Sequence, residues 1–525
     1  MLQSNKLEHR TNIYLLVILA IAAVLRMIFL SKVPIGFYCD EAFDGYEAYC
    51  LLQTLRSSSG EFLPLFLKRF NIDYSEASFK YIIAPFIHVF GLNEFAVRLP
   101  AAIIGILTIL VVYYIAKECF GKKVGLISAL FLAINPWDIH FNRIAFRVNL
   151  LVLLFCLGLL FFIKSFRNPK YLPLSAAIFA VSLHTYTAGR VFIPVFLLAL
   201  AIFFWEHLWS NKKQTLIAIA IFLPIFIFLF TQWTTPEGMV RVRSAGGIHN
   251  PLISAYSYLT YFSPKLLFFT GHPDYRFSNR SMGAFHYFEL ITIPAGLFFL
   301  LRENGKYKII LLLWLLLYPV PGFLISHYHA NRGFVGAPIF AILSAYGISK
   351  ILEQFRVSTK VYVSIIAFLA AASIAIFCKN YFVDYPNNSA YDWQYGIRDA
   401  IAYAEKSSYN CVVVSNDIGR SCGQSFIFVA FYTKYPPAQY QANQLNKTDA
   451  NGDRVMGKYR IVKLPKDPAP VMKRSLHEKD KCLLIVDAKK MGEISATGFD
   501  LQQVSAIKDP RGVELIKLIE VTKKT

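Results

Sequence analysis

The chain has 525 residues, of which 55% are hydrophobic and only 17% are charged, and its mean hydropathy is +0.44. Soluble domains carry about 25% charged residues, so this composition excludes an ordinary soluble protein and indicates an integral membrane protein. The net charge of +21 lies largely in short loops between apolar segments. Because membrane topology accounts for such loops, we do not expect nucleic acid as a partner.

The first apolar segment, from about Ile13 to Leu30, is long enough to cross a bilayer. No small-residue cleavage site follows it, so we expect it to be retained as a transmembrane helix. Asp40 and Glu41 come shortly after it, at the boundary between membrane and water. Two carboxylates there suit proton abstraction or the binding of a cationic group. Alternatively, Asp40 only caps a helix and Glu41 belongs to its first turn.

The loop at residues 31–96 contains two predicted helices. Apolar residues recur at helical spacing from Phe43 to Leu55, which predicts an amphipathic helix along the membrane surface. The apolar stretch Phe79–Leu92 is short and contains Pro85, so we expect a re-entrant or interfacial helix. Arg98 follows at the start of the next crossing, where it either snorkels to water or pairs with Glu41.

Ten further apolar segments follow, so we predict about eleven transmembrane helices. They lie at Val97–Ala116, Gly125–Trp137, Val148–Ile163, Leu172–Tyr186, Val191–Trp205, Leu216–Gln232, Phe288–Leu301, Ile309–Ile325, Gly336–Ile348 and Val361–Phe377. Alternate loops are short and basic, at 117–123, 164–170, 212–213, 302–308 and 350–360. By the positive-inside rule these loops and the N-terminus face the cytoplasm. The other loops, including the long loop 233–287, and the C-terminal region then lie outside.

The second outer loop contains Asp138, His140 and Arg143 next to a tryptophan. An Asp-x-His pair is incomplete as a metal site. The cluster suits the orientation of a charged lipid headgroup or a sugar, so we predict that these residues bind substrate.

Three later residues on the outer side are also predicted to bind substrate. Arg190 lies between two helices with almost no loop, where an arginine is costly unless it meets an anion. His329 and Arg332 precede another membrane helix. Each could be a polar residue solvated at the interface, or Arg332 could bind a phosphate on a lipid.

The region from residue 379 to 525 is predicted to be a separate extracytoplasmic α/β domain, after a transmembrane domain at 1–378. Its expected strands and helices are Cys411–Ser415, Tyr459–Lys463, Cys482–Asp487, Tyr395–Ala404 and Ser425–Thr433. It contains no glycine-rich phosphate loop, so we expect a structural or acceptor-recruiting role. One pair among Cys411, Cys422 and Cys482 could form a disulfide.

Three features together resemble the dolichyl-phosphate-mannose protein mannosyltransferase-like family, whose members have the GT-C membrane glycosyltransferase fold and are related to the lipid A aminoarabinose transferases. These features are the acidic pair, the sequence Gly-Leu-Asn-Glu-Phe-Ala-Val-Arg-Leu-Pro at 91–100, and Asn-Pro-Trp-Asp-Ile-His-Phe-Asn-Arg at 135–143. The resemblance covers roughly Ile13–Ile351. It implies a polytopic α-helical GT-C fold and inverting transfer of a sugar from a polyprenyl-phosphate donor to a hydroxyl of a protein, lipid or glycan.

The resemblance also implies roles for individual residues. Asp40 matches the general base, and Glu41 with Arg98 would orient it. Arg190, Arg143 and Arg332 are candidates to hold the leaving lipid phosphate. Because phosphate leaves as a stabilised anion and arginines can supply the positive charge, no cofactor is required and a divalent metal is not predicted.

Two other classes of protein remain as alternatives. A transporter or flippase for a lipid-linked or anionic substrate would place its ionisable groups along a pathway through the bilayer, whereas here they concentrate on one face. A noncatalytic assembly subunit would leave the Asp40–Glu41 pair and the arginines unexplained. We therefore expect a multi-pass glycosyltransferase of a bacterial or archaeal plasma membrane.

Overall fold

The computed structural model describes residues 2–70, 73–235, 239, 250–323, 328–419, 423–443, 445, 448–476, 481–493 and 497–524. They form two compact units. We call residues 1–28 and 101–380 the helical unit, and residues 29–100 and 381–525 the mixed unit. The domains expected from composition, 1–378 and 379–525, stay a proposal, because compact packing does not define which residues a membrane encloses.

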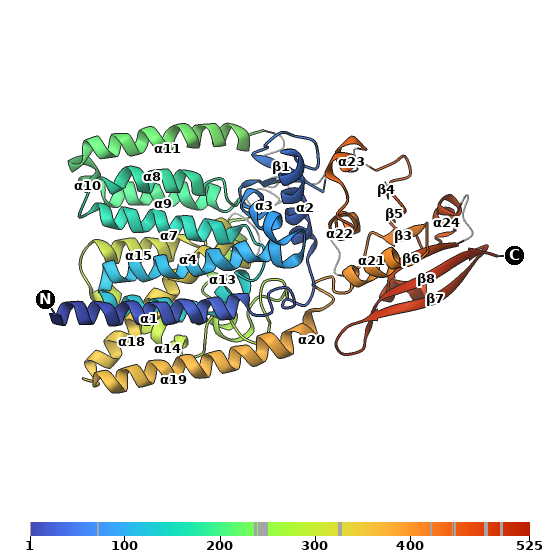
Figure 1. The fold of residues 1–525 in the computed structure, drawn as a ribbon. Helices are drawn as coiled ribbons and strands as arrows, with labels where there is room; N and C mark the ends of the chain where they lie inside the picture. The colour runs from blue at the N-terminus through green and yellow to red at the C-terminus, as the bar shows by residue number, and fades with distance from the viewer. Residues whose placement is uncertain are drawn as a thin grey trace. The chain divides into compact units, whose positions relative to one another are not determined.

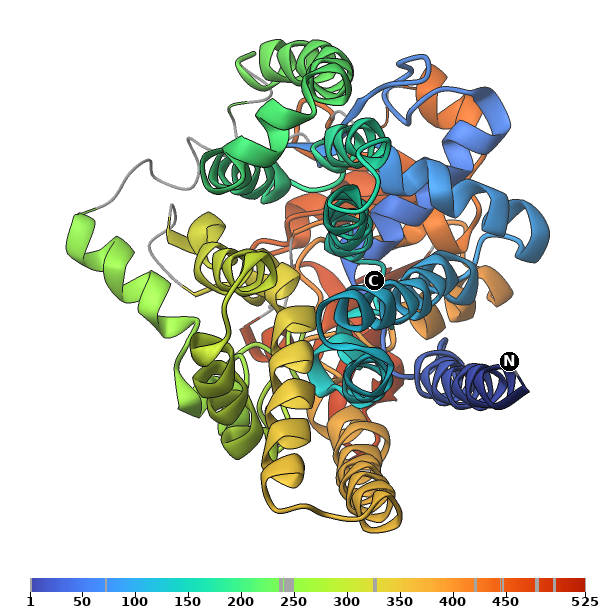
Figure 2. The same ribbon diagram turned by 90° about the vertical axis from the view of Figure 1, so that its left-hand side faces the viewer.

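The helical unit consists of helices that run side by side (Figure 1) and are mostly seen end-on in Figure 2. Its longer helices are α1 (Leu2–Met27), α4 (Glu94–Phe120, which begins in the mixed unit), α5 (Lys122–Ile134), α7 (Val148–Ser165), α8 (Tyr171–Ser182), α9 (Gly189–Phe203), α11 (Lys212–Trp233), α13 (Pro251–Thr260), α14 (Glu289–Arg302), α15 (Lys306–Leu317), α18 (Ala337–Gln354) and α19 (Thr359–Cys378). The shorter ones are α6 (Pro136–Phe141), α10 (Trp205–Ser210), η1 (Lys265–Thr270), α16 (Val320–Phe323), α17 (Ala330–Gly333) and η2 (Phe334–Gly336).

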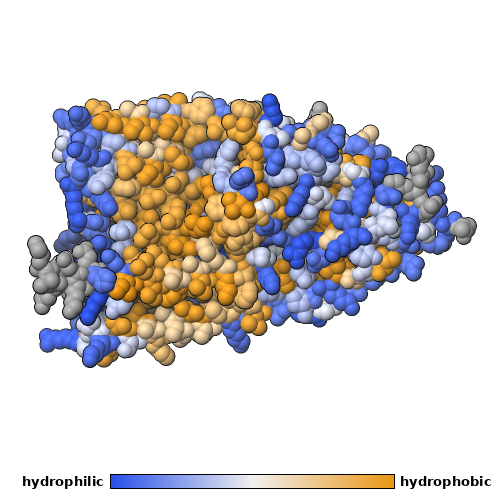
Figure 3. Space-filling view, viewed as in Figure 1, coloured by the Kyte–Doolittle hydropathy of each residue, from blue (hydrophilic) through white to orange (hydrophobic). Residues whose placement is uncertain are grey.

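Each predicted crossing overlaps one of these helices, and a band of hydrophobic residues covers them (Figure 3). Within the described residues, seven helices are long and apolar enough to cross a membrane. Others are shorter, such as α8 with 12 residues and α14 with 14. At 1.5 Å per residue, helices of this length span roughly 20 Å of a hydrocarbon core that is about 30 Å thick. The fold class is confirmed, whereas the count of eleven crossings stays a prediction.

Small residues let two of these helices pack closely. A methyl group on Gly296 of α14 would lie 1.9 Å from the carbonyl oxygen of Leu343 in α18, and one on Gly347 would lie 2.1 Å from that of Thr292. The Thr292 and Ser344 hydroxyls share a hydrogen bond of 2.6 Å across the same contact. Helices inside a bilayer associate through such close packing and polar contacts.

The basic loops gather at one end of the helical unit, which we call the basic end. The contacts that join these loops are Lys123–Glu353 at 3.9 Å, Arg167–Glu118 at 2.9 Å and the Lys306 ammonium 4.2 Å from the centre of the Phe166 ring. Gly121 and Gly305 have positive φ angles in the turns before α5 and α15, a conformation that glycine adopts without strain. The opposite end carries the loops with the predicted substrate-binding residues, and we call it the polar end.

The mixed unit begins with the residues that follow the first membrane helix. Helix α2 (Cys39–Thr54) packs against α3 (Ser78–Phe90), and the hairpin of β1 (Phe66–Arg69) and β2 (Asp73–Glu76) lies between them in sequence. Helix α2 also packs against α22 (Ser425–Tyr432) and α23 (Pro437–Ala442). Both predicted helices are present, and most residues of α2 are buried within its unit. The expected position of α2 along a membrane surface stays a prediction.

The rest of the mixed unit is an α/β domain with one six-stranded mixed sheet of order β4-β5-β3-β6-β8-β7. Strand β3 (Val412–Ser415) is parallel to both β5 (Tyr459–Val462) and β6 (Lys481–Asp487). Strand β4 (Arg454–Met456) pairs antiparallel with β5. Strand β8 (Glu514–Lys523) pairs antiparallel with both β6 and β7 (Phe499–Lys508). The remaining elements are η3 (Lys379–Asp384), α20 (Tyr385–Ser389), α21 (Ile397–Lys406), α24 (Ala469–Ser475) and η4 (Ala488–Glu493).

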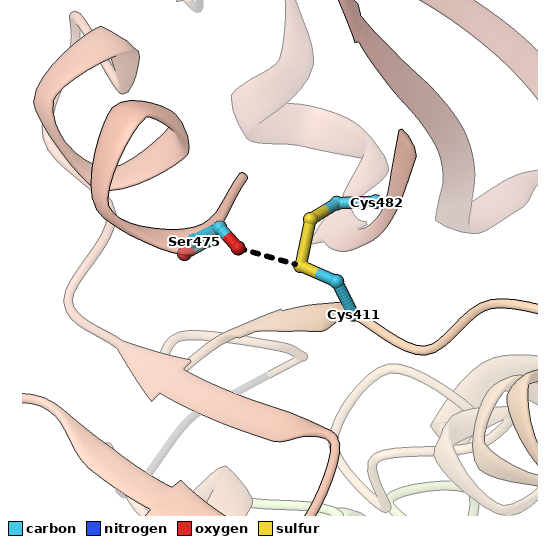
Figure 4. Close-up of a disulfide and its surroundings, with 3 residues drawn as sticks. All are labelled: Cys411, Ser475 and Cys482. Carbon is cyan, nitrogen blue, oxygen red and sulfur yellow. Dashed lines mark hydrogen bonds between the residues drawn. A yellow bond between two sulfur atoms is a disulfide. The ribbon is translucent and has the colours of Figure 1, made fainter. Parts of the chain in front are cut away.

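One disulfide joins two strands in the core of this sheet. Cys411, directly before β3, is bonded to Cys482 of β6, and the carbonyl oxygen of Ser475 lies 3.5 Å from the Cys411 sulfur (Figure 4). The bridge closes a loop across 71 positions of sequence. It is one of the pairs that the sequence left open, while Cys422 lies outside the described residues.

Candidate active site

The acidic pair lies in the first turn of α2. Tyr38 is the N-cap, in an extended conformation, and its backbone N–H donates to Glu41 Oε2 over 3.4 Å. Asp40 is therefore not the capping residue, which removes the simplest structural explanation for it. A carboxylate in this turn also interacts favourably with the positive end of the helix dipole.

Asp40 forms an ion pair that sequence analysis missed. Arg69, the last residue of β1, places Nη1 2.7 Å from Asp40 Oδ2. The Asp40 side chain nevertheless stays 40% exposed, whereas that of Glu41 is 2% exposed. Of the two carboxylates, only Asp40 is accessible to a substrate.

Glu41 is fixed by Arg98, as one of the two alternatives predicted. Arg98 Nε and Nη2 each donate to one Glu41 oxygen over 2.9 Å, which is the bidentate geometry of a strong charge-assisted pair. The same guanidinium donates to the backbone carbonyls of Leu30, Pro34 and Gly36 over 3.2, 3.1 and 2.6 Å. The pair thus holds the start of α2 against the segment that precedes it.

Further buried polar pairs continue along α2. Lys80 of α3 lies 3.0 Å from Asp44, and both side chains are almost inaccessible. One turn later, Glu47 accepts hydrogen bonds from the Ser58 hydroxyl and from the Ser58 N–H, the latter over 3.0 Å. Burial raises the pKa of Glu47 to about 7, although the bonds from Ser58 oppose this shift.

The start of α2 is also joined to the carboxyl ends of the parallel strands. The Cys39 N–H donates to the Gln394 side chain over 3.0 Å, and the Gln394 amide donates to the carbonyl of Ile418 over 3.5 Å. The next residue, Gly419, donates its N–H to Asp487 at the end of β6 over 2.9 Å. Ligands of open α/β sheets bind at this edge, where neighbouring strands diverge. These hydrogen bonds connect Cys39, the neighbour of Asp40, to the carboxyl ends of β3 and β6.

In the helical unit, Asp138 is buried and paired with Arg26 of α1. Arg26 also donates to the carbonyl of Ala133 over 2.9 Å, and the Asn135 side chain accepts from the Asp138 N–H over 2.9 Å. The Asp138 side chain is 1% exposed, so its observed contacts are structural. Sequence analysis missed Arg26, although an arginine within a transmembrane segment is itself a signal for a buried partner.

The two other residues of this loop are equally buried. His140 Nε2 lies 3.0 Å from the carbonyl oxygen of Arg276. A carbonyl only accepts, so this nitrogen carries the proton. Arg143 donates over 2.8 Å to the carbonyls of Leu25 and Ile28, and thereby satisfies backbone groups at the end of α1.

The remaining predicted residues also lie at the polar end. The Arg190 guanidinium lies 5.4 Å from the centre of the Trp233 ring. His329 contacts Tyr261, whose hydroxyl donates to the His329 carbonyl over 3.1 Å. Burial raises the pKa of Tyr261, and the positive charge of the nearby Arg332 opposes that shift. His329 therefore contacts Tyr261 through its backbone, and the charge of Arg332 acts on the same tyrosine.

Burial also changes the pKa of two histidines in the long loop of this unit. It lowers the pKa of His272 and of His286 to about 4. His286 Nε2 lies 2.8 Å from the carbonyl oxygen of Ile134. Both rings are therefore neutral near pH 7. Among the described residues, no three side chains of His, Cys, Asp or Glu are grouped closely enough to hold a metal ion.

Sequence comparison relates part of the chain to known sugar transferases. Residues 78–230 match the dolichyl-phosphate-mannose-protein mannosyltransferase family. Over 148 residues the chain is 26% identical to YkcB of Bacillus subtilis, whose name assigns it a mannosyltransferase activity. The match covers 28% of this chain and spans about one fifth (20%) of the length of YkcB.

Structural comparison extends over nearly the whole chain. ArnT from Cupriavidus metallidurans, in its apo state, superimposes with a TM-score of 0.59 at 13% identity, over 96% of this chain and 97% of ArnT. ArnT bound to undecaprenyl phosphate gives a TM-score of 0.58 at 12% identity, over the same shares of the two chains.

The archaeal oligosaccharyltransferase AglB from Archaeoglobus fulgidus, in complex with an inhibitory peptide and a dolichol-phosphate, gives a TM-score of 0.54 at 14% identity. This superposition covers 91% of this chain and 69% of AglB. Identities this low establish the fold alone. The chain is therefore an integral membrane protein with the GT-C glycosyltransferase fold, and its resemblance to the dolichyl-phosphate-mannose protein mannosyltransferase family is confirmed over residues 78–230.

Proposed function

We propose that this protein is an inverting glycosyltransferase that moves a sugar from a polyprenyl-phosphate donor to a hydroxyl acceptor on the extracytoplasmic face. The observation that carries the proposal is the arrangement of Asp40, which is accessible and held by Arg69, beside a Glu41 that Arg98 fixes in place. The GT-C fold and the ArnT structure bound to undecaprenyl phosphate support a lipid-linked donor.

In this reaction Asp40 is the general base. Its carboxylate accepts the proton of the acceptor hydroxyl while the hydroxyl oxygen forms a bond to the anomeric carbon. The bond from that carbon to the phosphate oxygen breaks on the opposite face, and the lipid phosphate leaves with the bonding electrons. Glu41 and Arg98 position Asp40 through the first turn of α2 and do not exchange protons themselves.

The leaving phosphate needs positive charge, and arginines at the polar end of the helical unit supply it in this proposal. Arg190 is the first candidate and Arg332 the second, in the order that the resemblance gives them. We assign Asp138, His140 and Arg143 an indirect role, since their side chains are buried and bonded to neighbouring backbone or to Arg26. His329 supports Arg332 through their shared neighbour Tyr261.

The α/β domain is proposed to recruit the acceptor. The hydrogen-bonded chain from Cys39 through Gln394 to Gly419 and Asp487 supports this role, because it joins the start of α2 to the ligand-binding edge of the sheet. The AglB complex with an inhibitory peptide is a precedent for a peptide ligand on this fold. The acceptor of this protein is a protein, a lipid or a glycan.

Two independent features support the proposed orientation. The basic end of the helical unit faces the cytoplasm in this proposal, by the positive-inside rule. The Cys411–Cys482 disulfide supports an extracytoplasmic α/β domain, because disulfides persist in oxidising compartments.

The test is donor consumption by the purified protein. Detergent-solubilised protein is incubated with polyprenyl-phosphate sugars carrying labelled mannose, other hexoses or pentoses, together with a membrane extract as acceptor. We expect label to move to the extract and free polyprenyl phosphate to accumulate with at least one donor. Intact donors that merely change leaflet in proteoliposomes would contradict the proposal and favour a flippase.

A further inference from the structure

A polar pocket of about 240 Å³ opens at the basic end of the helical unit, away from every residue assigned to sugar transfer. It lies among the end of α4, the end of α14, the start of α15 and the end of α18. Four charged side chains line it: Glu303, Lys308, Lys350 and Glu353. Two carboxylates and two ammonium groups make the charge of this lining balanced.

Aromatic packing gives one wall of the pocket a fixed shape. The rings of Phe120 and Tyr346 stack with their centres 4.1 Å apart and their planes inclined by 17°. The Tyr346 hydroxyl donates a hydrogen bond to Glu303 Oε1. This contact joins α18 to the end of α14 and holds one carboxylate oxygen of Glu303 against Tyr346.

The ion pairs in the pocket are long, while Lys308 Nζ donates to the carbonyl oxygen of Leu301 over 2.7 Å. Lys350 Nζ lies 4.0 Å from Glu303 and 3.9 Å from Glu353, and Lys123 lies 3.9 Å from Glu353. Charge-assisted hydrogen bonds between such groups are about 2.8 Å long. Lys350 and the two carboxylates that it joins are all partly exposed, at 37% for Lys350, 45% for Glu303 and 52% for Glu353. A ligand with both charges can therefore replace these contacts at little cost, because exposed ion pairs contribute little stability.

We propose that this pocket binds the zwitterionic headgroup of an aminophospholipid, with its phosphate at Lys308 and Lys350 and its ammonium group at Glu303 and Glu353. The balanced lining favours a zwitterion, whereas sites for anionic lipids are clusters of Lys and Arg alone.

The surroundings of the pocket favour a lipid over a soluble phosphate compound. On α14, Phe298 and Leu301 are large apolar side chains that are 49% and 52% exposed, within one turn or so of Glu303. An acyl chain attached to a headgroup in the pocket would lie along such side chains, inside the membrane boundary.

The test compares lipid retention by the whole protein. Purified wild type is delipidated in detergent, exposed to vesicles of phosphatidylcholine with either phosphatidylethanolamine or phosphatidylglycerol, and analysed by native mass spectrometry. We expect preferential retention of phosphatidylethanolamine. Lys350→Gln and Glu303→Gln each remove one charged contact and should lower retention about tenfold. Lys360→Gln, an exposed lysine of the same end, should retain the lipid like wild type.

Each alternative outcome contradicts the proposal. Equal retention of the two lipids would show that the pocket does not select a zwitterion. Retention that survives both pocket substitutions would place the bound lipid elsewhere. Equal affinity for soluble phosphoethanolamine would mean that the ligand is a free phosphate compound. A circular dichroism spectrum like that of wild type checks that each variant is folded.

Discussion

Arg69 Nη1 lies 2.7 Å from Asp40 Oδ2, so the last residue of a short strand holds the accessible carboxylate at the start of α2. The contact joins residues 29 positions apart. It restricts the carboxylate to one orientation while leaving the Asp40 side chain 40% exposed. A general base needs such a fixed orientation, because proton transfer requires hydrogen-bond geometry with the acceptor hydroxyl.

Removal of this guanidinium should slow the chemical step. We expect Arg69→Ala to lower kcat about tenfold, the effect of losing one charge-assisted positioning contact, with little change in KM for the donor. Arg69→Lys should recover part of the rate, since an ammonium can still pair with Asp40. Single-turnover kinetics with the labelled donor measures both. A kcat that is unchanged in Arg69→Ala would contradict a positioning role.

Disruption of the Glu41–Arg98 pair should strongly destabilise the protein, because both side chains are buried. Arg98→Lys loses the bidentate geometry and leaves a buried carboxylate poorly paired, so we expect a loss of about 3 kcal/mol or more in unfolding free energy. The matched control is Arg398→Lys, whose partner Glu94 lies 3.4 Å away and whose own side chain is 55% exposed. Its expected cost is below about 1 kcal/mol. Melting curves of the solubilised variants compare the two, and equal shifts would contradict the account.

Stability should also depend on the protonation of Glu47. Burial raises its pKa from 4.5 to about 7, so the folded protein binds the proton more tightly than the unfolded chain. The stabilisation is fully present below pH 4.5, falls as the pH rises through 7 and is lost above it. The whole change is on the order of 3 kcal/mol.

The measurement is the melting temperature of wild type and Glu47→Gln between pH 5 and pH 8. The introduced glutamine side chain stays neutral throughout this range, so the variant should lose this component of the pH dependence. Parallel curves for the two proteins would show that Glu47 is ionised in the folded state throughout.

Donor binding should depend on the arginines of the polar end. We expect Arg190→Ala to raise KM for the polyprenyl-phosphate sugar by about tenfold to a hundredfold, and Arg332→Ala by less, because each removes positive charge from the proposed phosphate site. Arg280→Ala is the control, since Arg280 is exposed in a loop of the same end. An unchanged KM in either variant would show that the substituted arginine does not bind the donor phosphate.

Local sequence patterns were sufficient for the helices and for three strands. Hydropathy located every predicted crossing on a helix, because a helix satisfies its own backbone and therefore needs only an apolar stretch. Runs of apolar residues likewise located β3, β5 and β6. Strands β7 and β8 were missed because exposed and apolar residues are mixed along them, so neither contains a continuous apolar run. Strand β8 is fixed by pairing with β6, a contact that local sequence does not show.

Contacts between distant residues were harder to predict. The Glu41–Arg98 pair was foreseen because both ends are charged residues at one membrane boundary. The Asp40–Arg69 and Asp138–Arg26 pairs were not, since each depends on how chain segments fold back on one another. The second of these pairs buries Asp138, whose predicted substrate contact stays a prediction. Burial of that kind is set by tertiary packing, and its signal in the sequence is Arg26 inside the first transmembrane segment, which indicates a buried partner without identifying it.

The central claim is that Asp40 is the catalytic base, and the most direct test is sugar transfer by Asp40→Asn. Asparagine keeps the size and the place of the side chain in α2 but cannot accept the proton. We predict that transfer from the labelled polyprenyl-phosphate sugar falls about 100-fold or more, while the melting temperature and donor binding stay close to wild type. Transfer at the wild-type rate by a folded Asp40→Asn variant would contradict the account.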